Sequence, residues 1–124
     1  MSTTDLTVDV TAPHGRPAVV AVAGTLDLRT APVLYQDATD LIDRHPVLIV
    51  DLTDVTFCDS SGLNALLRLY RRSREVAGEL ILAAPPPHVA RLLSLTGSDR
   101  LLQVYGTVAE ARAAGPAADR PGPG

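Results

Sequence analysis

Apolar residues recur along the chain with two different spacings, and this pattern predicts an ordered series of strands and helices. Residues 6 to 10 alternate between apolar and polar, as in a half-buried strand. Residues 18 to 23 form a continuous, valine-rich run that ends at Gly24. Because the turn-forming residues 14 to 17 separate the two runs, we expect the chain to begin with a β-hairpin.

Helical spacing follows the hairpin in three places. The first helix is expected to begin after Thr30, its cap, and to end before Pro46. The second begins at Ser60 and stops near Gly78, and the third lies within residues 85 to 97, between a run of prolines and a glycine. The apolar positions that define these helices are Leu34, Ala38, Leu41 and Ile42, then Leu63, Leu66, Leu67 and Tyr70, then Val89, Leu92 and Leu93.

Short apolar runs between the helices predict further strands. Residues 47 to 50 are continuously apolar, which is typical of a central strand buried on both faces, and residues 51 to 54 are expected to leave it as a loop. Residues 80 to 82 and 101 to 105 predict two more strands, and residues 108 to 114 predict a last short helix.

The resulting order is β-β-α-β-α-β-α-β-α. An initial hairpin followed by alternating helices and strands predicts an α/β fold, with a mixed, mostly parallel sheet and helices packed on it. We expect one domain over residues 1 to 114. Residues 115 to 124 are rich in Pro, Gly and Ala, and we expect them to form a disordered tail.

Composition narrows the class of protein. A hydrophobic content of 46% in 124 residues fits one domain with a buried core, and a net charge of −3 disfavours general binding of nucleic acid. One cysteine excludes an internal disulfide, no apolar run is long enough to span a membrane, and the first residues lack the pattern of a signal peptide. We therefore expect a soluble, cytoplasmic monomer with no direct contact to nucleic acid or membrane.

Catalytic chemistry finds little support in the sequence. All 11 basic residues are arginine, which excludes a phosphate-binding loop of the Gly-Lys-Ser type. Asp51 follows a buried strand, as in receiver domains of two-component systems, but the lysine of that family is absent too. Residues 58 to 62 lack the first glycine of a hydrolase nucleophile elbow. Cys58 is expected to be a small buried hydrophobe, since neighbouring Asp59 would raise the pKa of its thiol.

The three histidines are scattered and have no cysteine or carboxylate at the spacing of a metal site. Together with the missing catalytic groups, this pattern predicts no metal, no cofactor and no catalytic residue. We expect the chain not to be an enzyme.

Residues 57 to 64, Phe-Cys-Asp-Ser-Ser-Gly-Leu-Asn, are the most informative stretch. They place Ser60 and Ser61 at the N-terminus of a helix, where backbone N–H groups are unpaired. A serine in that position can cap the helix, bind an anion or accept a phosphoryl group, and the residues alone leave capping and modification equally open. On the same helix, Arg68, Arg71, Arg72 and Arg74 form either a solvated face or a contact for an acidic partner.

These residues resemble the STAS domain of bacterial anti-sigma factor antagonists. The motif Asp59-Ser60-Ser61-Gly62-Leu63 is quite specific in its strand-to-helix context, and Gly78-Glu79-Leu80 follows it as in the family. Gly24-Thr25-Leu26-Asp27 is similar to the family's Gly-Glu-Leu-Asp. Residues 91 to 97 look like its Arg-Leu-Phe…Ser-Gly segment. The resemblance covers about residues 5 to 114.

What the resemblance implies is a regulatory role. Ser60 maps onto the phosphoacceptor, which a small serine kinase of the histidine-kinase ATPase type, itself the anti-sigma factor, phosphorylates. A metal-dependent serine phosphatase reverses this reaction, and the dephosphorylated form binds the anti-sigma factor and frees the sigma factor. The implied partner surface consists of Asp27, Asp59, Ser60, Ser61, Gly62 and Asn64.

The sequence departs from the family pattern at two positions near this surface. Asn64 replaces a glycine, and Thr25 replaces a glutamate, so both change the chemistry next to the acceptor. A second function remains open on the same fold: a STAS subunit or scaffold of a transporter or sensory assembly, without a phosphorylation cycle.

Overall fold

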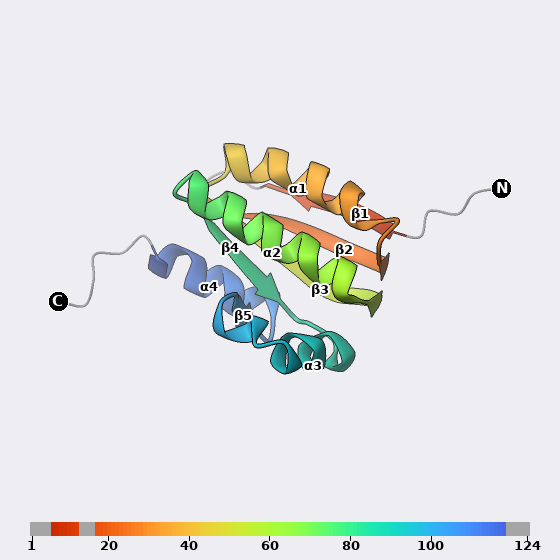
Figure 1. The fold of residues 1–124 in the computed structure, drawn as a ribbon. Coiled ribbons are helices and arrows are strands. Elements are labelled where there is room, and N and C mark those ends of the chain that lie inside the picture. Colours follow the sequence, from red (N-terminus) through yellow and green to blue (C-terminus); the bar gives the residue numbers. More distant parts are fainter. Residues whose placement is uncertain (1–5, 13–16, 119–124) are drawn as a thin grey trace.

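The protein is built on one five-stranded sheet with the strand order β1-β2-β3-β4-β5 (Figure 1). The computed structural model describes residues 6–12 and 17–118. Strands β1 and β2 pair antiparallel, and all later neighbours pair parallel. The elements are β1 (Leu6–Thr11), β2 (Ala18–Leu26), α1 (Ala31–Arg44), β3 (Val47–Cys58), α2 (Ser60–Glu75), β4 (Glu79–Ala83), α3 (Pro87–Leu95), the 3₁₀ turn η1 (Ser98–Arg100), β5 (Gln103–Tyr105) and α4 (Val108–Ala118).

The predicted fold class is confirmed, including the mixed sheet and the order of helices and strands. The expected hairpin turn over residues 14 to 17 falls largely on residues 13–16, which lie outside the described residues. None of the helices in the described part of the chain has the length and hydropathy to cross a membrane.

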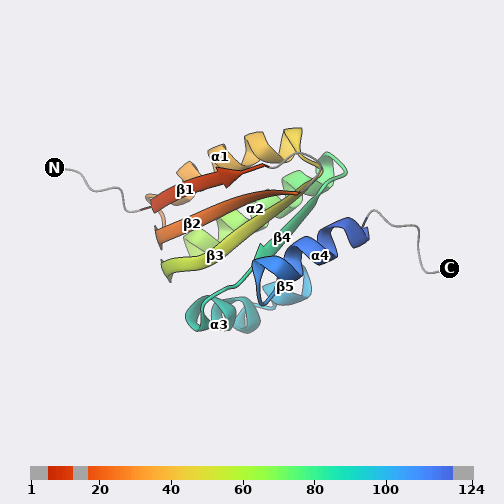
Figure 2. The ribbon, with the colours of Figure 1, turned by 180° about the vertical axis from the view of Figure 1, so that it is seen from behind.

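Helices cover both faces of the sheet, as the two opposite views show (Figures 1 and 2). One face packs against α1, α2 and α3 and forms the main core, because alternate residues of β2 and β3 point to it. The other face of β3 and β4 packs against α4 through a smaller cluster that includes Ile49, Ile81 and Ala111. Residues 47–50 are buried on both faces, as a central strand requires.

Two strands run further than the sequence predicted. Strand β2 continues through Gly24 to Leu26, and β3 continues through residues 51 to 58, so the loop expected at residues 51 to 54 is wrong. The reason is that these extensions pair with each other, with Leu26 opposite Cys58, beyond the point at which β4 has ended. This part of β3 has only one neighbouring strand, and only one of its faces is buried. Polar residues are therefore tolerated on its other face.

The backbone at the end of α2 explains why position 78 is a glycine. Ala77, with φ of 58°, takes the left-handed position that ends the helix, and Gly78 N–H donates back to Ser73 O at 2.7 Å. A Cβ at Gly78 would lie 2.7 Å from the Pro46 carbonyl oxygen, so this glycine is needed for close approach of the backbone. Gly97 lies beyond the end of α3 with φ of 75°, as its predicted role requires.

The C-terminal elements differ from the sequence prediction in length. The expected strand over residues 101 to 105 is shortened to Gln103–Tyr105, because η1 and a turn use the residues before it. Helix α4 runs to Ala118 and so extends past residue 114, where the helix was expected to end. The disordered tail expected over residues 115 to 124 stays a prediction. Alanine has the highest helix propensity, which favours a helix in this alanine-rich segment. Residues 119–124 lie outside the described residues.

Candidate functional site

The junction between β3 and α2 places the two serines of the motif. Asp59 is the cap of α2: its carboxylate accepts hydrogen bonds from the N–H groups of Ser61 at 2.9 Å and Gly62 at 3.1 Å. Ser60 is the first residue of the helix and is exposed, and within the described part of the chain its hydroxyl forms no hydrogen bond. Capping by Ser60 is therefore wrong, and the cap belongs to the residue before it.

Because Asp59 rather than Ser60 caps α2, we predict different effects for substitutions at these two neighbouring residues. We expect Asp59→Ala to lower the free energy of unfolding by about 1 kcal/mol, the usual effect of losing a helix cap. Ser60→Ala should change it by only a few tenths of a kcal/mol, because no hydrogen bond is lost. Urea unfolding of both variants checks this, and an equal loss for the two substitutions would contradict the assignment of the cap.

Asp27 occupies the corresponding position at the end of β2. Its carboxylate accepts from Arg29 N–H at 3.0 Å and Thr30 N–H at 3.3 Å, which ties down the loop before α1. Thr30 precedes α1 as predicted, but its hydroxyl does not cap that helix. The Thr30 hydroxyl donates to the Thr25 carbonyl oxygen at 2.7 Å and accepts from Asp27 N–H at 2.9 Å.

Strand register brings Asp27 and Asp59 to the same edge of the sheet. Leu26 is paired with Cys58, and each aspartate follows one of them. Asp59 N–H donates to the Leu26 carbonyl oxygen at 3.3 Å, which closes the junction between the two strand ends. Gly62 is buried beneath this contact, so it contributes close packing rather than exposed surface.

The Cys58 side chain is half-buried under the first turn of α2 and packs against the main core. Burial, and secondarily the charge of Asp59, raise the pKa of the Cys58 thiol to about 11. The thiol is therefore protonated at neutral pH, which agrees with the prediction of a small apolar group and excludes a ready nucleophile.

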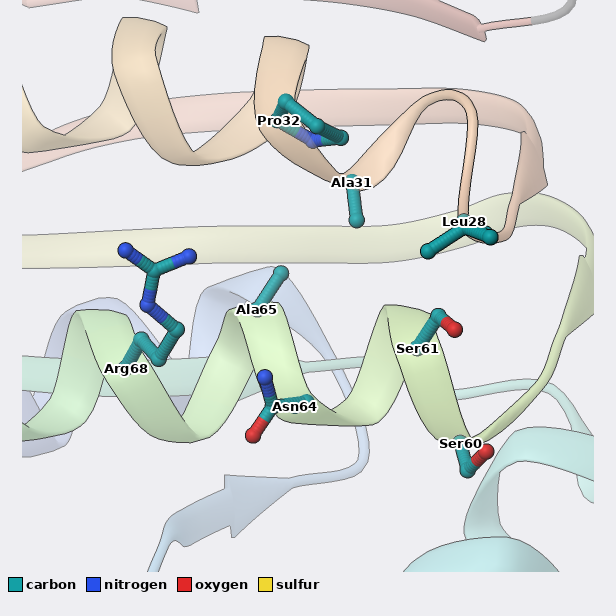
Figure 3. A pocket seen from close by; sticks show the side chains of 8 residues that line it. All are labelled: Leu28, Ala31, Pro32, Ser60, Ser61, Asn64, Ala65 and Arg68. Atoms are coloured by element: carbon teal, nitrogen blue, oxygen red, sulfur yellow. The ribbon is translucent and has the colours of Figure 1, made fainter.

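A groove of about 270 Å³ runs between the start of α1 and α2 (Figure 3). Three residues of the predicted partner surface line it, namely Ser60, Ser61 and Asn64, and Asp27, Asp59 and Gly62 do not. The other lining residues are Leu28, Ala31, Pro32, Ala65 and Arg68. Ser60 therefore lies at one end of a surface hollow, and Arg68 lies two helical turns away.

Sequence reasoning missed the apolar side of this groove. Leu28 lines the groove in the loop between β2 and α1, and it is 74% exposed. A leucine in an otherwise polar loop sequence was the available signal, but its exposure follows only from the fold.

Comparison with known proteins places this geometry in a family. The model of the STAS domain matches residues 8–111. An anti-sigma F factor antagonist of Paenibacillus polymyxa is 28% identical over 94 residues, which cover 74% of this chain and 80% of that protein. An anti-sigma-B factor antagonist of Listeria monocytogenes is 30% identical over 87 residues, which cover 68% of this chain and 75% of that protein.

A solved structure extends the likeness to nearly the whole chain. The crystal structure of an anti-sigma factor antagonist from Mycobacterium paratuberculosis superposes with a TM-score of 0.81 at 33% identity, covering 94% of this chain and 99% of the other. The chain therefore belongs to the STAS domain family, among the anti-sigma factor antagonists.

Proposed function

We propose that this protein is a phosphorylation-controlled antagonist of an anti-sigma factor that acts in the cytoplasm. With Ser60 unmodified, it binds an anti-sigma factor that is a serine kinase of the histidine-kinase ATPase type, and the sigma factor is released. Phosphorylation of Ser60 by that kinase ends the interaction, and a metal-dependent serine phosphatase restores it. The chain itself is the acceptor rather than an enzyme.

The observation that carries this proposal is the state of the Ser60 hydroxyl. It is exposed at the first position of α2 and is spared from capping by Asp59. Because Asp59 supplies the cap, the Ser60 hydroxyl can accept a phosphoryl group without loss of the hydrogen bonds that hold the helix end. The named antagonists among the relatives support the choice of partner.

Electrostatics explains how the modification would act. Phosphorylation adds a charge of about −1.5 to −2. Three helix donors next to Ser60 are already occupied, since Asp59 accepts from the N–H groups of Ser61 and Gly62 through its carboxylate and from that of Leu63 through its carbonyl oxygen. The new charge therefore stays on the surface beside Asp59, and a docked partner would have to bury it unpaired, which costs several kcal/mol.

A second candidate is a scaffold role without phosphorylation, in a transporter or sensory assembly. It uses the same fold and the same groove, and it differs in one respect: its binding would not depend on the chemistry of residue 60. The exposed, unbonded Ser60 hydroxyl favours the first function.

The experiment that tests the proposal is a paired capture from native cell lysate, with Ser60→Ala and Ser60→Asp proteins as baits. We expect an ATPase-type kinase to be enriched at least tenfold on the Ser60→Ala bait relative to the Ser60→Asp bait, a difference of about 1.4 kcal/mol. Mass spectrometry identifies the captured proteins. Incubation of wild-type protein with the captured kinase and ATP should then add one phosphate, on Ser60.

Ser94→Asp provides the matched control, because Ser94 is exposed on α3 and does not line the groove. It adds the same charge and should capture the kinase as well as the wild-type protein does. Equal capture of the same partners by the Ser60→Ala and Ser60→Asp baits would overturn the switch and support the scaffold function.

A further inference from the structure

The arginines of α2 are not equivalent. Arg72 is neutralised: its guanidinium contacts the Asp43 carboxylate at 3.0 Å and the Glu75 carboxylate at 3.3 Å. These two carboxylates raise the pKa of Arg72, with the Asp43 hydrogen bond as the largest cause. Arg68 and Arg71 are exposed, and within the described residues neither has a carboxylate at ion-pair distance. Together with Arg74, they leave three arginines of α2 without an ion pair in the described part of a chain whose net charge is −3.

The charges of Arg68 and Arg71 are continuous with the Ser60 groove. Arg68 lines that groove and also a second hollow of about 190 Å³, which it shares with Tyr35, Arg71, Arg72 and Glu75. Figure 3 shows the Arg68 side chain extending from α2 toward α1. The face between the two helices is thus apolar near Leu28 and basic near Arg68.

Arg68 is also held in place. Its guanidinium carbon lies 4.1 Å from the centre of the Tyr35 ring, within the range of a cation–π contact. A stacked guanidinium loses less conformational freedom when it binds a carboxylate, and its planar donors match a carboxylate in two parallel hydrogen bonds. The contact with Tyr35 makes the Arg68 side chain less flexible than an unstacked side chain on the surface. This favours a defined docking contact over a solvated helix face.

We infer that the partner kinase docks an acidic segment along the face between α1 and α2, with carboxylates on Arg68 and Arg71 and an apolar side chain near Leu28. The inference rests on the proposed function and names the chemistry of its partner. Charge complementarity supports it, because neither arginine has a carboxylate at ion-pair distance in the part of the chain that the structure describes. Nucleic acid fits poorly, since a chain with a net charge of −3 would repel an extended polyanion, whereas a short acidic segment needs only these two arginines.

The test uses the purified kinase recovered on the Ser60→Ala bait and measures its dissociation constant for single and double variants. We expect Arg68→Gln and Arg71→Gln each to weaken binding by about three- to tenfold at low salt, and the double variant by roughly tenfold or more. The loss should shrink at about 0.5 M salt, because exposed charge pairs are screened. Arg74→Gln is the matched control, since Arg74 is exposed on the same helix and lines neither hollow.

Three results separate the possibilities. Unchanged binding of the double variant at low salt would overturn the acidic docking segment and leave the Ser60 switch intact. A loss of equal size at low and high salt would also overturn it, because packing rather than charge would then be responsible. Arg71→Gln controls for misfolding of the Arg68→Gln protein. Unlike Arg68, Arg71 contacts no aromatic ring within the described residues, so its replacement removes no such contact. Failure of every bait to retain a kinase would overturn the proposed function together with this partner.

Discussion

Replacing Gly62 with alanine is expected to lower the free energy of unfolding by about 2 kcal/mol, within the range of 1–3 for an overpacked site. A Cβ at this position would lie 2.5 Å from the Leu26 carbonyl oxygen, 2.7 Å from Leu26 Cγ and 3.0 Å from Cys58 Sγ. The nearest of these atoms is backbone at the end of β2 and cannot rotate away. The steric cost therefore exceeds the gain of about 1 kcal/mol that alanine has over glycine in a helix.

Urea unfolding measures the effect, and Asn64→Ala is the matched control. Asn64 is exposed two residues later on α2, so alanine there should stabilise the protein slightly through helix propensity alone. A Gly62→Ala protein that unfolds at the same or a higher urea concentration than wild type would show that α2 can move away from β2 without loss. The glycine would then lack the packing role assigned to it.

Alkylation of Cys58 at pH 8 is expected to be about a hundredfold slower in the native protein than in the unfolded chain. The folded structure raises the thiol pKa from 9.0 to about 11, so the reactive thiolate fraction falls by two powers of ten. For the same reason, the contribution of this group to folding stability is fully present below pH 9 and is lost as the pH rises toward 11.

Cys58 is the only cysteine, so total alkylation reports on this one thiol without interference. The rate is followed with a thiol reagent between pH 7 and 10 in buffer and in denaturant. In buffer it should still be rising tenfold per pH unit at the top of this range. A native rate that levels off near pH 9 would mean that the thiol is neither desolvated nor disfavoured by Asp59.

Much of the fold could be predicted because its periodic elements are regular. The alternation in β1, the valine run of β2 and the helical spacing of α1, α2 and α3 each reflect a single buried face. The outer half of β3 escaped prediction for the opposite reason. Residues 52 to 54 look like a loop in sequence, and they belong to the strand because β2 pairs with this part of β3 after β4 has ended.

The candidate site was predictable in position but not in its assignments. Asp59 and Ser60 are both good helix caps, and only the extended backbone of Asp59 decides between them. The groove could not be predicted from the sequence, because its lining residues come from α1 with the loop before it and from α2, which are separated along the chain. Arg68 and Arg72 look alike in the sequence, and Asp43, from a different helix, is what separates their roles.

The occupied donors at the start of α2 have a consequence for the lifetime of the protein. A phosphate on Ser60 would gain no new backbone hydrogen bond from Ser61, Gly62 or Leu63, and it would break none. Under the proposed switch, this backbone hydrogen bonding contributes equally to the stability of both forms. It therefore gives proteases that act on unfolded chains no means of removing one form faster than the other.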